Sequence, residues 1–255
     1  MLDICMCSDE KLIEFIPVVI NSVMGKNSHH VITIHYIHNI EDDSKVSKLV
    51  STLELHKNVQ VKTYYKTWDY KYNSPLKKAI SPATMLRLFI PELIDCEKLV
   101  YLDIDVIVNC DLEQLADIDC GGTGVTLKDS IMDTWVKSKV GKTSGNAGVA
   151  VFDIPTLVEN DFTNKCLDIV NSGKYGNNLH DQDAINIFCE GKHTKLPKQF
   201  NIFINQDDEL LKKHSEYILH YAGSKKPFKG KAGNCLLYTS PSPRDQRGSR
   251  MPSSA

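Results

Sequence analysis

The chain has 255 residues, of which 42% are hydrophobic and 24% are charged, and its formal net charge is −2. This is ordinary globular composition, and the length suits one large α/β domain or two small ones. The small net charge gives no field that would recruit nucleic acid or an anionic membrane, so no nucleic-acid partner is expected.

The first 65 residues alternate between strand and helix patterns. Short β-branched or apolar runs predict strands over residues 2–7, 31–37 and 59–61. Apolar residues at helical spacing predict helices over 12–23 and 46–53. This βαβαβ order predicts a parallel sheet covered by helices on both faces.

The rest of the chain continues the alternation of helices and strands. Ligands of such sheets bind beyond the carboxyl ends of the strands. No GxGxxG follows the first strand, so a dinucleotide cofactor is not indicated. The predicted helices cover 82–93, 154–170 and 181–189, and the predicted strands cover 98–102, 124–127 and 149–152.

The cysteines and the termini bear on location. Eight cysteines are scattered without zinc-site spacing, and most lie in apolar stretches. A disulfide framework is therefore not expected, which favours a reducing, cytoplasmic compartment. No secretory signal is visible, and no run of 18 apolar residues predicts a transmembrane helix.

The last residues differ in composition from the rest. From Leu236 onward the chain carries three of its ten prolines and every arginine except Arg87. Disorder is one interpretation. Our hypothesis is foreign read-through sequence in place of the natural C-terminus. We therefore predict one domain over 1–230 and a disordered or non-native tail over 231–255.

The strongest local signal is the segment Tyr101–Val108, in which Asp103 and Asp105 follow a hydrophobic strand. Residues two apart share a face of extended backbone, so both carboxylates can point at one cation. Two like charges this close are costly without a positive partner, and a divalent metal fits. The alternative is a pair of exposed carboxylates in a turn. The flanking apolar runs argue against this alternative, because they place the pair at the end of a strand.

A second signal is the segment His220–Phe228. A neutral imidazole of His220 could complete a metal site, and a mixed oxygen and nitrogen ligand set suits Mn²⁺, with Mg²⁺ as the alternative. Gly223 would let the backbone approach a phosphate, and Lys226 would supply a positive charge. Without the aspartates, the same segment is equally well a polar loop with a lysine cluster.

Together these segments resemble the family 8 retaining glycosyltransferases, which include bacterial lipopolysaccharide galactosyltransferases and glucosyltransferases, and glycogenin. The family's YLDxDxxV motif is matched at Tyr101–Val108 and its HxxGxxKPW motif at His220–Phe228, with phenylalanine in place of tryptophan. Asn146–Val149 is similar to FNxGV, Asp181–Asn186 to DQDxLN, and Leu196–Asn201 to LPxxWN. The motifs occur in the family's order.

The resemblance implies a single GT-A-type glycosyltransferase domain over 1–230, with a Rossmann-like, mainly parallel central sheet and helices on both faces. It implies Asp103, Asp105 and His220 as metal ligands. It implies nucleotide-sugar contacts by Cys7, Ser8, Asp9, Arg87, Asp103, Ile104, Asp105, Gly223 and Lys226. It implies Asn146, Asp181 and Gln182 around the transferred sugar, with Asp129 as a weaker candidate, and Lys226 assisting catalysis.

The activity implied is transfer of galactose or glucose, with retention, from UDP-galactose or UDP-glucose to a hydroxyl of a glycan or lipopolysaccharide. One alternative is a catalytically silent nucleotide-sugar-binding protein of the same fold. Another is a sugar nucleotidyltransferase, but the glycine-rich phosphate loop expected near its N-terminus is absent. Residues 65–81 are polar and aromatic and could form a lid over the donor. The sequence does not decide on peripheral membrane contact.

Overall fold

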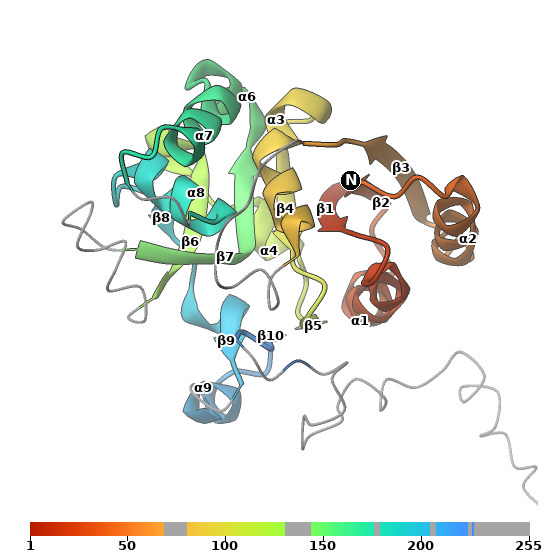
Figure 1. The fold of residues 1–255 in the computed structure, drawn as a ribbon. Coiled ribbons are helices and arrows are strands. Elements are labelled where there is room, and N and C mark those ends of the chain that lie inside the picture. Colours follow the sequence, from red (N-terminus) through yellow and green to blue (C-terminus); the bar gives the residue numbers. More distant parts are fainter. Residues whose placement is uncertain (69–80, 131–143, 176–178, 205–207, 224–225, 227–255) are drawn as a thin grey trace, which may run out of the picture.

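The computed structural model describes residues 1–68, 81–130, 144–175, 179–204, 208–223 and 226. A central sheet has helices on both faces, and a small second sheet lies beside it (Figure 1). Most of the expected lid, as well as Phe228 and the tail 231–255, lies outside the described residues.

The central sheet contains seven strands in the order β3-β2-β1-β4-β7-β6-β8. Neighbouring strands are parallel except at β7, which is antiparallel to both β4 and β6. The predicted mainly parallel sheet is confirmed. Its strands are β1 (Leu2–Ser8), β2 (Ile32–His38), β3 (Val59–Tyr65), β4 (Lys98–Leu102), β6 (Val125–Ser130), β7 (Ser144–Asp153) and β8 (Thr194–Lys195).

Helices cover each face because strand side chains alternate between the faces. In β1, Ile4 and Met6 join the hydrophobic cluster beneath the first helices, whereas Cys5 and Cys7 join the cluster on the opposite face. One face packs against α1 (Ile16–Asn27), α2 (Asp43–Leu53) and α4 (Glu113–Ala116). The other packs against η3 (Pro82–Phe89), α3 (Ile90–Leu93), α6 (Ile154–Glu159), α7 (Phe162–Asn171) and α8 (Asp181–Cys189).

Two predicted helices differ in detail from the observed ones. The segment predicted at 82–93 is a 3₁₀-helix over Pro82–Phe89, followed by one short α-helix. The helix predicted at 154–170 is broken into α6 and α7 at Asp161, whose φ is 53°. Aspartate tolerates this left-handed conformation better than most residues, so the chain turns there and both helices keep an apolar face on the sheet.

The second sheet was not predicted. It pairs β5 (Val106–Asn109) with β10 (Tyr217–His220) and β10 with β9 (Ile202–Phe203). The short strands carry little periodicity, so their pairing is visible only in the tertiary structure. Between these elements lie η5 (Lys198–Asn201) and α9 (Asp208–Lys213), and η1 (Ile13–Phe15) and η4 (Gly121–Thr123) are single 3₁₀ turns.

A bulge in β7 shapes the end of the central sheet. Leu127 pairs with Ala150, but the next residue, Lys128, pairs with Asn146. The residues between them on β7 are therefore displaced from the β6 ladder, which is what defines a β-bulge. The Gly148 carbonyl instead accepts the Asp103 N–H at 2.8 Å, which joins the bulge to the loop after β4.

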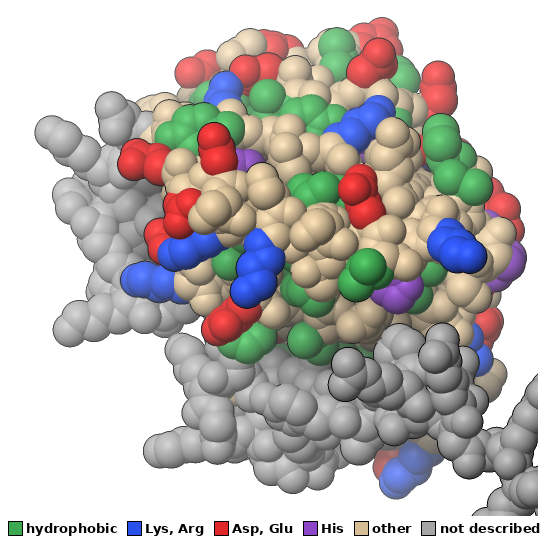
Figure 2. All heavy atoms as spheres, turned by 90° about the vertical axis from the view of Figure 1, so that its right-hand side faces the viewer, with side chains coloured by type: hydrophobic (Ala, Val, Ile, Leu, Met, Phe, Trp, Pro, Cys, Tyr) green, Lys and Arg blue, Asp and Glu red, His purple; other side chains and the backbone are tan. Residues whose placement is uncertain are grey.

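The surface carries mixed charge. On the face shown in Figure 2, acidic and basic side chains are interspersed among polar and apolar ones. Across the part of the chain that the structure describes, the helices are too short or too polar to span a bilayer.

Candidate active site

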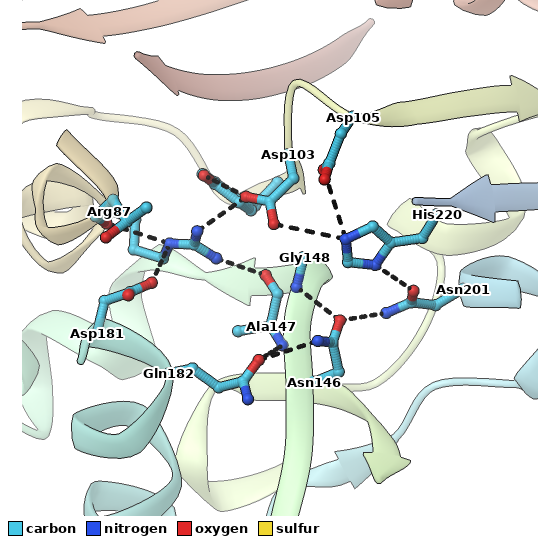
Figure 3. A network of polar contacts seen from close by, with 12 residues as sticks. Arg87, Asp103, Asp105, Asn146, Ala147, Gly148, Asp181, Gln182, Asn201 and His220 are labelled. Carbon is cyan, nitrogen blue, oxygen red and sulfur yellow. Dashed lines mark hydrogen bonds and ion pairs between the residues drawn. The ribbon is translucent and has the colours of Figure 1, made fainter. Parts of the chain in front are cut away.

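Three candidate metal ligands converge beyond the carboxyl end of β4. Asp103 and Asp105 follow β4, and the antiparallel pairing of β10 with β5 sets His220 opposite Val106. The Tyr221 N–H donates to the Asp105 carbonyl at 3.0 Å, which extends this register to the loop. One ligand atom from each of the three side chains lies within 4.8 Å of the others. Figure 3 shows all three side chains pointing toward one another.

The two carboxylates have different surroundings. His220 Nε2 lies 3.4 Å from Asp105 Oδ1 and 3.8 Å from Asp103 Oδ2. Lys226 Nζ contacts the second oxygen of Asp105. Burial by itself raises the pKa of Asp105, but His220 and then Lys226 outweigh it and lower the pKa of this carboxyl below its usual range. Burial raises the pKa of Asp103, partly opposed by Arg87 and reinforced by Asp105.

Arg87 links the Asp103 carboxylate to the start of α8. Its side chain is 4% exposed, and its Nη2 donates to Asp103 Oδ1 at 2.8 Å. Its Nε lies 2.6 Å from Asp181 Oδ2, and its Nη1 donates to the Ala147 carbonyl at 2.7 Å. The guanidinium also lies 4.3 Å from the centre of the Tyr101 ring. Burial opposes the charge, but Asp103 and Asp181 prevail and raise the pKa of Arg87, so it stays a cation.

A chain of neutral amides forms the opposite side of the site (Figure 3). Gln182 Oε1 accepts from Asn146 Nδ2 at 3.0 Å and from the Ala147 N–H at 3.1 Å. Asn146 Oδ1 accepts from the Gly148 N–H at 3.0 Å and from Asn201 Nδ2 at 2.9 Å. Both oxygens face backbone N–H groups, which can only donate, and this determines the orientation of each amide.

The orientation of this chain selects the tautomer of His220. Because the Asn201 amide nitrogen donates to Asn146, its Oδ1 is the atom that faces His220 Nδ1, at 2.9 Å. Nδ1 therefore carries a proton, and Nε2 is the ring nitrogen that faces Asp103 and Asp105. A histidine that ligates a metal through one nitrogen and donates from the other has this arrangement.

Gly148 provides the space in which these groups meet. A Cβ at this position would lie 2.7 Å from Asp103 Oδ2 and 2.9 Å from His220 Nε2. Real Cβ atoms do not approach other atoms this closely. The bulge in β7 thus brings backbone, not side chain, against the three candidate ligands.

The expected nucleotide contacts lie on the neighbouring strand. Cys7 and Ser8 end β1, which is parallel to β4. The Ser8 hydroxyl lies 2.8 Å from the Tyr36 hydroxyl, and Asp9 Oδ2 accepts from the Ser81 hydroxyl. Cys7 is buried, and Asp9 is partly exposed. Their contact with a nucleotide stays a prediction.

The remaining predicted residues divide into two groups. Ile104 lies between the two aspartates in the chain and is partly buried against the core, Lys226 contacts Asp105, and Gly223 is exposed with φ 90°, three residues after His220. Asp129 differs, because its oxygens lie 3.1 Å from His193 Nε2 and 2.7 Å from Lys195 Nζ. The contacts the structure gives Asp129 run to the β8 edge of the sheet.

Sequence reasoning gave no role to Asn201 or Tyr101. Asn201 was recognised only as the last residue of a motif, yet it is fully buried and orients His220. The Tyr101 hydroxyl donates to Asp103 Oδ1 at 3.0 Å. The available signal was that both residues belong to the segments that carry the family resemblance.

A mainly parallel α/β sheet with an acidic pair and a histidine at its carboxyl edge is the arrangement that the sequence motifs predict for a GT-A-type glycosyltransferase. The model of the family "Glycosyl transferase family 8" matches residues 3–232, and the chain belongs to this family.

Curated relatives agree with this assignment. A lipopolysaccharide 1,2-glucosyltransferase of Escherichia coli (strain K12) is 25% identical over 86% of this chain and 70% of its own length. Glycosyltransferase GlyF of Streptococcus pneumoniae serotype 4 is 28% identical over 58% of this chain. The match spans 38% of GlyF, so that relative is much longer than the shared region.

Solved structures show the same fold. The galactosyltransferase LgtC, in complex with donor and acceptor sugar analogs, has a TM-score of 0.74 and 21% identity, over 94% of this chain and 92% of its own. Mouse xyloside xylosyltransferase 1 in its apo form has a TM-score of 0.61 and 14% identity, over 88% of this chain and 98% of its own.

Proposed function

We propose that this family 8 member is a metal-dependent, retaining hexosyltransferase that uses UDP-galactose or UDP-glucose and transfers the sugar to a glycan hydroxyl. The observation that carries the proposal is the convergence of Asp103, Asp105 and His220 within 4.8 Å, next to the lysine of the second motif.

The residues present fit a divalent ion. Two carboxylates and one imidazole form a mixed set of oxygen and nitrogen ligands, which suits Mn²⁺, with Mg²⁺ as the alternative. Nε2 of His220 faces both carboxylates, because Asn201 occupies Nδ1, and a neutral ring would offer the Nε2 lone pair to an ion there. Gly148 leaves the space between the ligands free of a side chain. When bound, such an ion supplies electrostatic stabilisation of the charge that develops on the UDP leaving group.

The protein's own groups have separate tasks in this proposal. Lys226 carries a positive charge at the edge of the metal cluster, where it would bind the diphosphate and stabilise it as it leaves. Cys7, Ser8 and Asp9 would line the nucleoside end, at the carboxyl edge of β1. Arg87 would act through Asp103 and Asp181, because its described contacts hold both carboxylates in place.

The sugar would lie between the amide chain and Asp181, where polar oxygens can stabilise positive character at the anomeric carbon. Gln182 directs its oxygen at Asn146 and at backbone, and Asp181 is paired with Arg87. In the contacts that the structure gives them, neither group is activated by a neighbouring base or exposed as a free charge. These contacts support front-face attack by the acceptor over a covalent glycosyl-enzyme.

The proposal is tested by UDP release from UDP-galactose and from UDP-glucose, with Mn²⁺ or with EDTA, for the wild type and for Asp105→Ala. We expect release that requires the metal and is abolished by the substitution, and the preferred donor will be identified by the faster reaction. The control is Glu159→Gln, which removes an exposed carboxylate on α6 and should leave release unchanged.

Two results would contradict parts of the proposal. Tight binding of UDP and Mn²⁺ without release from either donor would favour a catalytically silent nucleotide-sugar-binding protein or another donor sugar. Equal rates of UDP release in EDTA and in Mn²⁺ would show that the reaction does not require a metal.

A further inference from the structure

A second group of metal-ligating side chains lies at the other end of the sheet. His29 and His30 follow α1 and precede β2, and Asp111 follows β5. His29 Nε2 lies 3.3 Å from Asp111 Oδ2, and His30 Nε2 lies 2.9 Å from Asp111 Oδ1. Ligand atoms of all three lie within 4.8 Å of one another. This histidine-rich cluster is at the N-terminal end of β2, whereas the candidate active site is at the carboxyl end of β4.

One buried asparagine fixes the position of Asp111. Asn27 is the last residue of α1, and its side chain is fully buried. Its Nδ2 donates to the Cys110 carbonyl at 3.0 Å, and its Oδ1 accepts the Leu112 N–H at 2.8 Å. It therefore holds the peptide groups on both sides of Asp111. The Glu113 N–H donates to Asp111 Oδ1 at 3.0 Å and sets the rotation of the carboxylate.

A second asparagine holds the two histidines in the same way. Asn58 Nδ2 donates to the Ser28 carbonyl at 3.0 Å and to the His30 carbonyl, on either side of His29. The His30 N–H donates to the Asn27 carbonyl at 3.0 Å, which connects the histidine pair to the residue that holds Asp111. The backbone of all three side chains is thus fixed before any ligand binds, which lowers the entropic cost of binding.

The cluster is open to an ion from solvent. The side chains of His29, His30 and Asp111 are 60%, 12% and 28% exposed. The two imidazole rings lie 3.9 Å apart, so two imidazolium charges would repel each other there, whereas one shared cation would attract both nitrogens. The C-terminal end of α1 adds a favourable partial negative charge.

We propose that His29, His30 and Asp111 form a second divalent-metal site that prefers Zn²⁺. Two nitrogens, one carboxylate oxygen and an exposed fourth position form a ligand set that zinc adopts with a water molecule. Imidazole ligands favour zinc over Mn²⁺ and Mg²⁺, which prefer more oxygen ligands. The two sites of this chain therefore differ in the ion that they select, and the second does not depend on the proposed transferase activity.

The test is a calorimetric titration of the full, tag-free chain with Zn²⁺ alone, in an Asp103→Ala/Asp105→Ala background that removes the first cluster. We expect one zinc per chain, and an affinity reduced at least about tenfold by His29→Ala or by the isosteric Asp111→Asn. His56→Ala is the matched control, because His56 contacts Asn21 outside the cluster, and it should change nothing.

A second measurement uses the wild-type chain and depends on no substitution in the active site. Histidine side-chain NMR signals should shift first for His29 and His30 when Zn²⁺ is added below one equivalent. Zinc affinity that is unchanged by both cluster variants, or NMR shifts confined to other histidines, would overturn the proposal. The cluster would then be a surface ion-pair group only.

Discussion

The two sides of the candidate active site are built from different interactions. On one side, a buried arginine joins Asp103 to Asp181 through charge-assisted contacts. On the other, hydrogen bonds from backbone N–H groups of β7 orient the uncharged amides of Gln182 and Asn146. Asn146 in turn orients Asn201, whose oxygen contacts His220 Nδ1. The first side holds two carboxylates against one buried cation, whereas the second determines which ring nitrogen of His220 faces the carboxylates. The comparison predicts that substitutions on the charged side mainly lower the free energy of unfolding, whereas substitutions on the amide side mainly lower metal affinity.

The largest effect is expected at Arg87. Substitution by methionine, which preserves most of the side-chain volume, leaves the buried Asp181 and the partly exposed Asp103 without their shared cation. Breaking a buried ion pair on one side costs about 3–5 kcal/mol, so the free energy of unfolding in urea should fall by that amount. Arg87→Lys keeps the charge but not the fork of donors, and should lose less. An unchanged urea midpoint in Arg87→Met would show that the carboxylates find other partners.

Gly148→Ala should reduce metal affinity more than it reduces stability. The new methyl group would stand between Asp103 and His220, and relieving the contact moves at least one ligand. Overpacking of this kind costs about 1–3 kcal/mol of stability. Calorimetry with Mn²⁺ and a thermal melt measure the two effects. Gly25→Ala, in α1 with no atom near the new methyl group, is the control and should bind Mn²⁺ normally.

Asn201→Ala tests the amide side directly. Without Asn201, the proton of His220 is no longer held on Nδ1, and Asn146 loses a donor. Loss of such an outer-shell partner lowers metal affinity by roughly 10–100-fold. Asn201→Asp keeps an acceptor for Nδ1 and should recover part of the loss. If both variants bind Mn²⁺ like the wild type, the amide chain does not control the histidine.

The smallest effect is expected at Asp129, which belongs to neither side. Its carboxylate contacts His193 and Lys195 at the β8 edge. A partly exposed pair of this kind contributes at most about 1 kcal/mol, so Asp129→Asn should change stability by less than that. UDP release should be unaffected. A strong loss of UDP release with unchanged stability would indicate that Asp129 contacts the transferred sugar.

Local patterns predicted the parts of the fold in which neighbours along the chain are neighbours in space. Periodicity predicted the first three strands and the helices between them. Their arrangement followed because consecutive strands of a βαβ unit usually lie side by side. The start and end of α8 were predicted at Asp181 and Cys189. At its N-terminus, the Asp183 carboxylate accepts the His180 N–H and so caps the helix. The break at Asp161 was missed, because nothing in the apolar spacing marks a single left-handed residue.

The carboxylate pair and the histidine were predicted from their motifs, but their meeting was not derivable from spacing alone. Asp105 and His220 meet because β10 pairs with β5, a contact between distant segments whose strands are too short to show a pattern.

The sequence by itself determined the family, the order of the elements and the residue types at the candidate metal cluster, because these depend on local composition and on motifs. Only the tertiary structure decided that Arg87 is shared between two carboxylates and that the β7 bulge presents Gly148 to them. It also decided that backbone N–H groups, acting through three amides, orient His220. Each of these features depends on contacts between individual polar atoms, and packing between segments far apart in the chain determines which atoms meet.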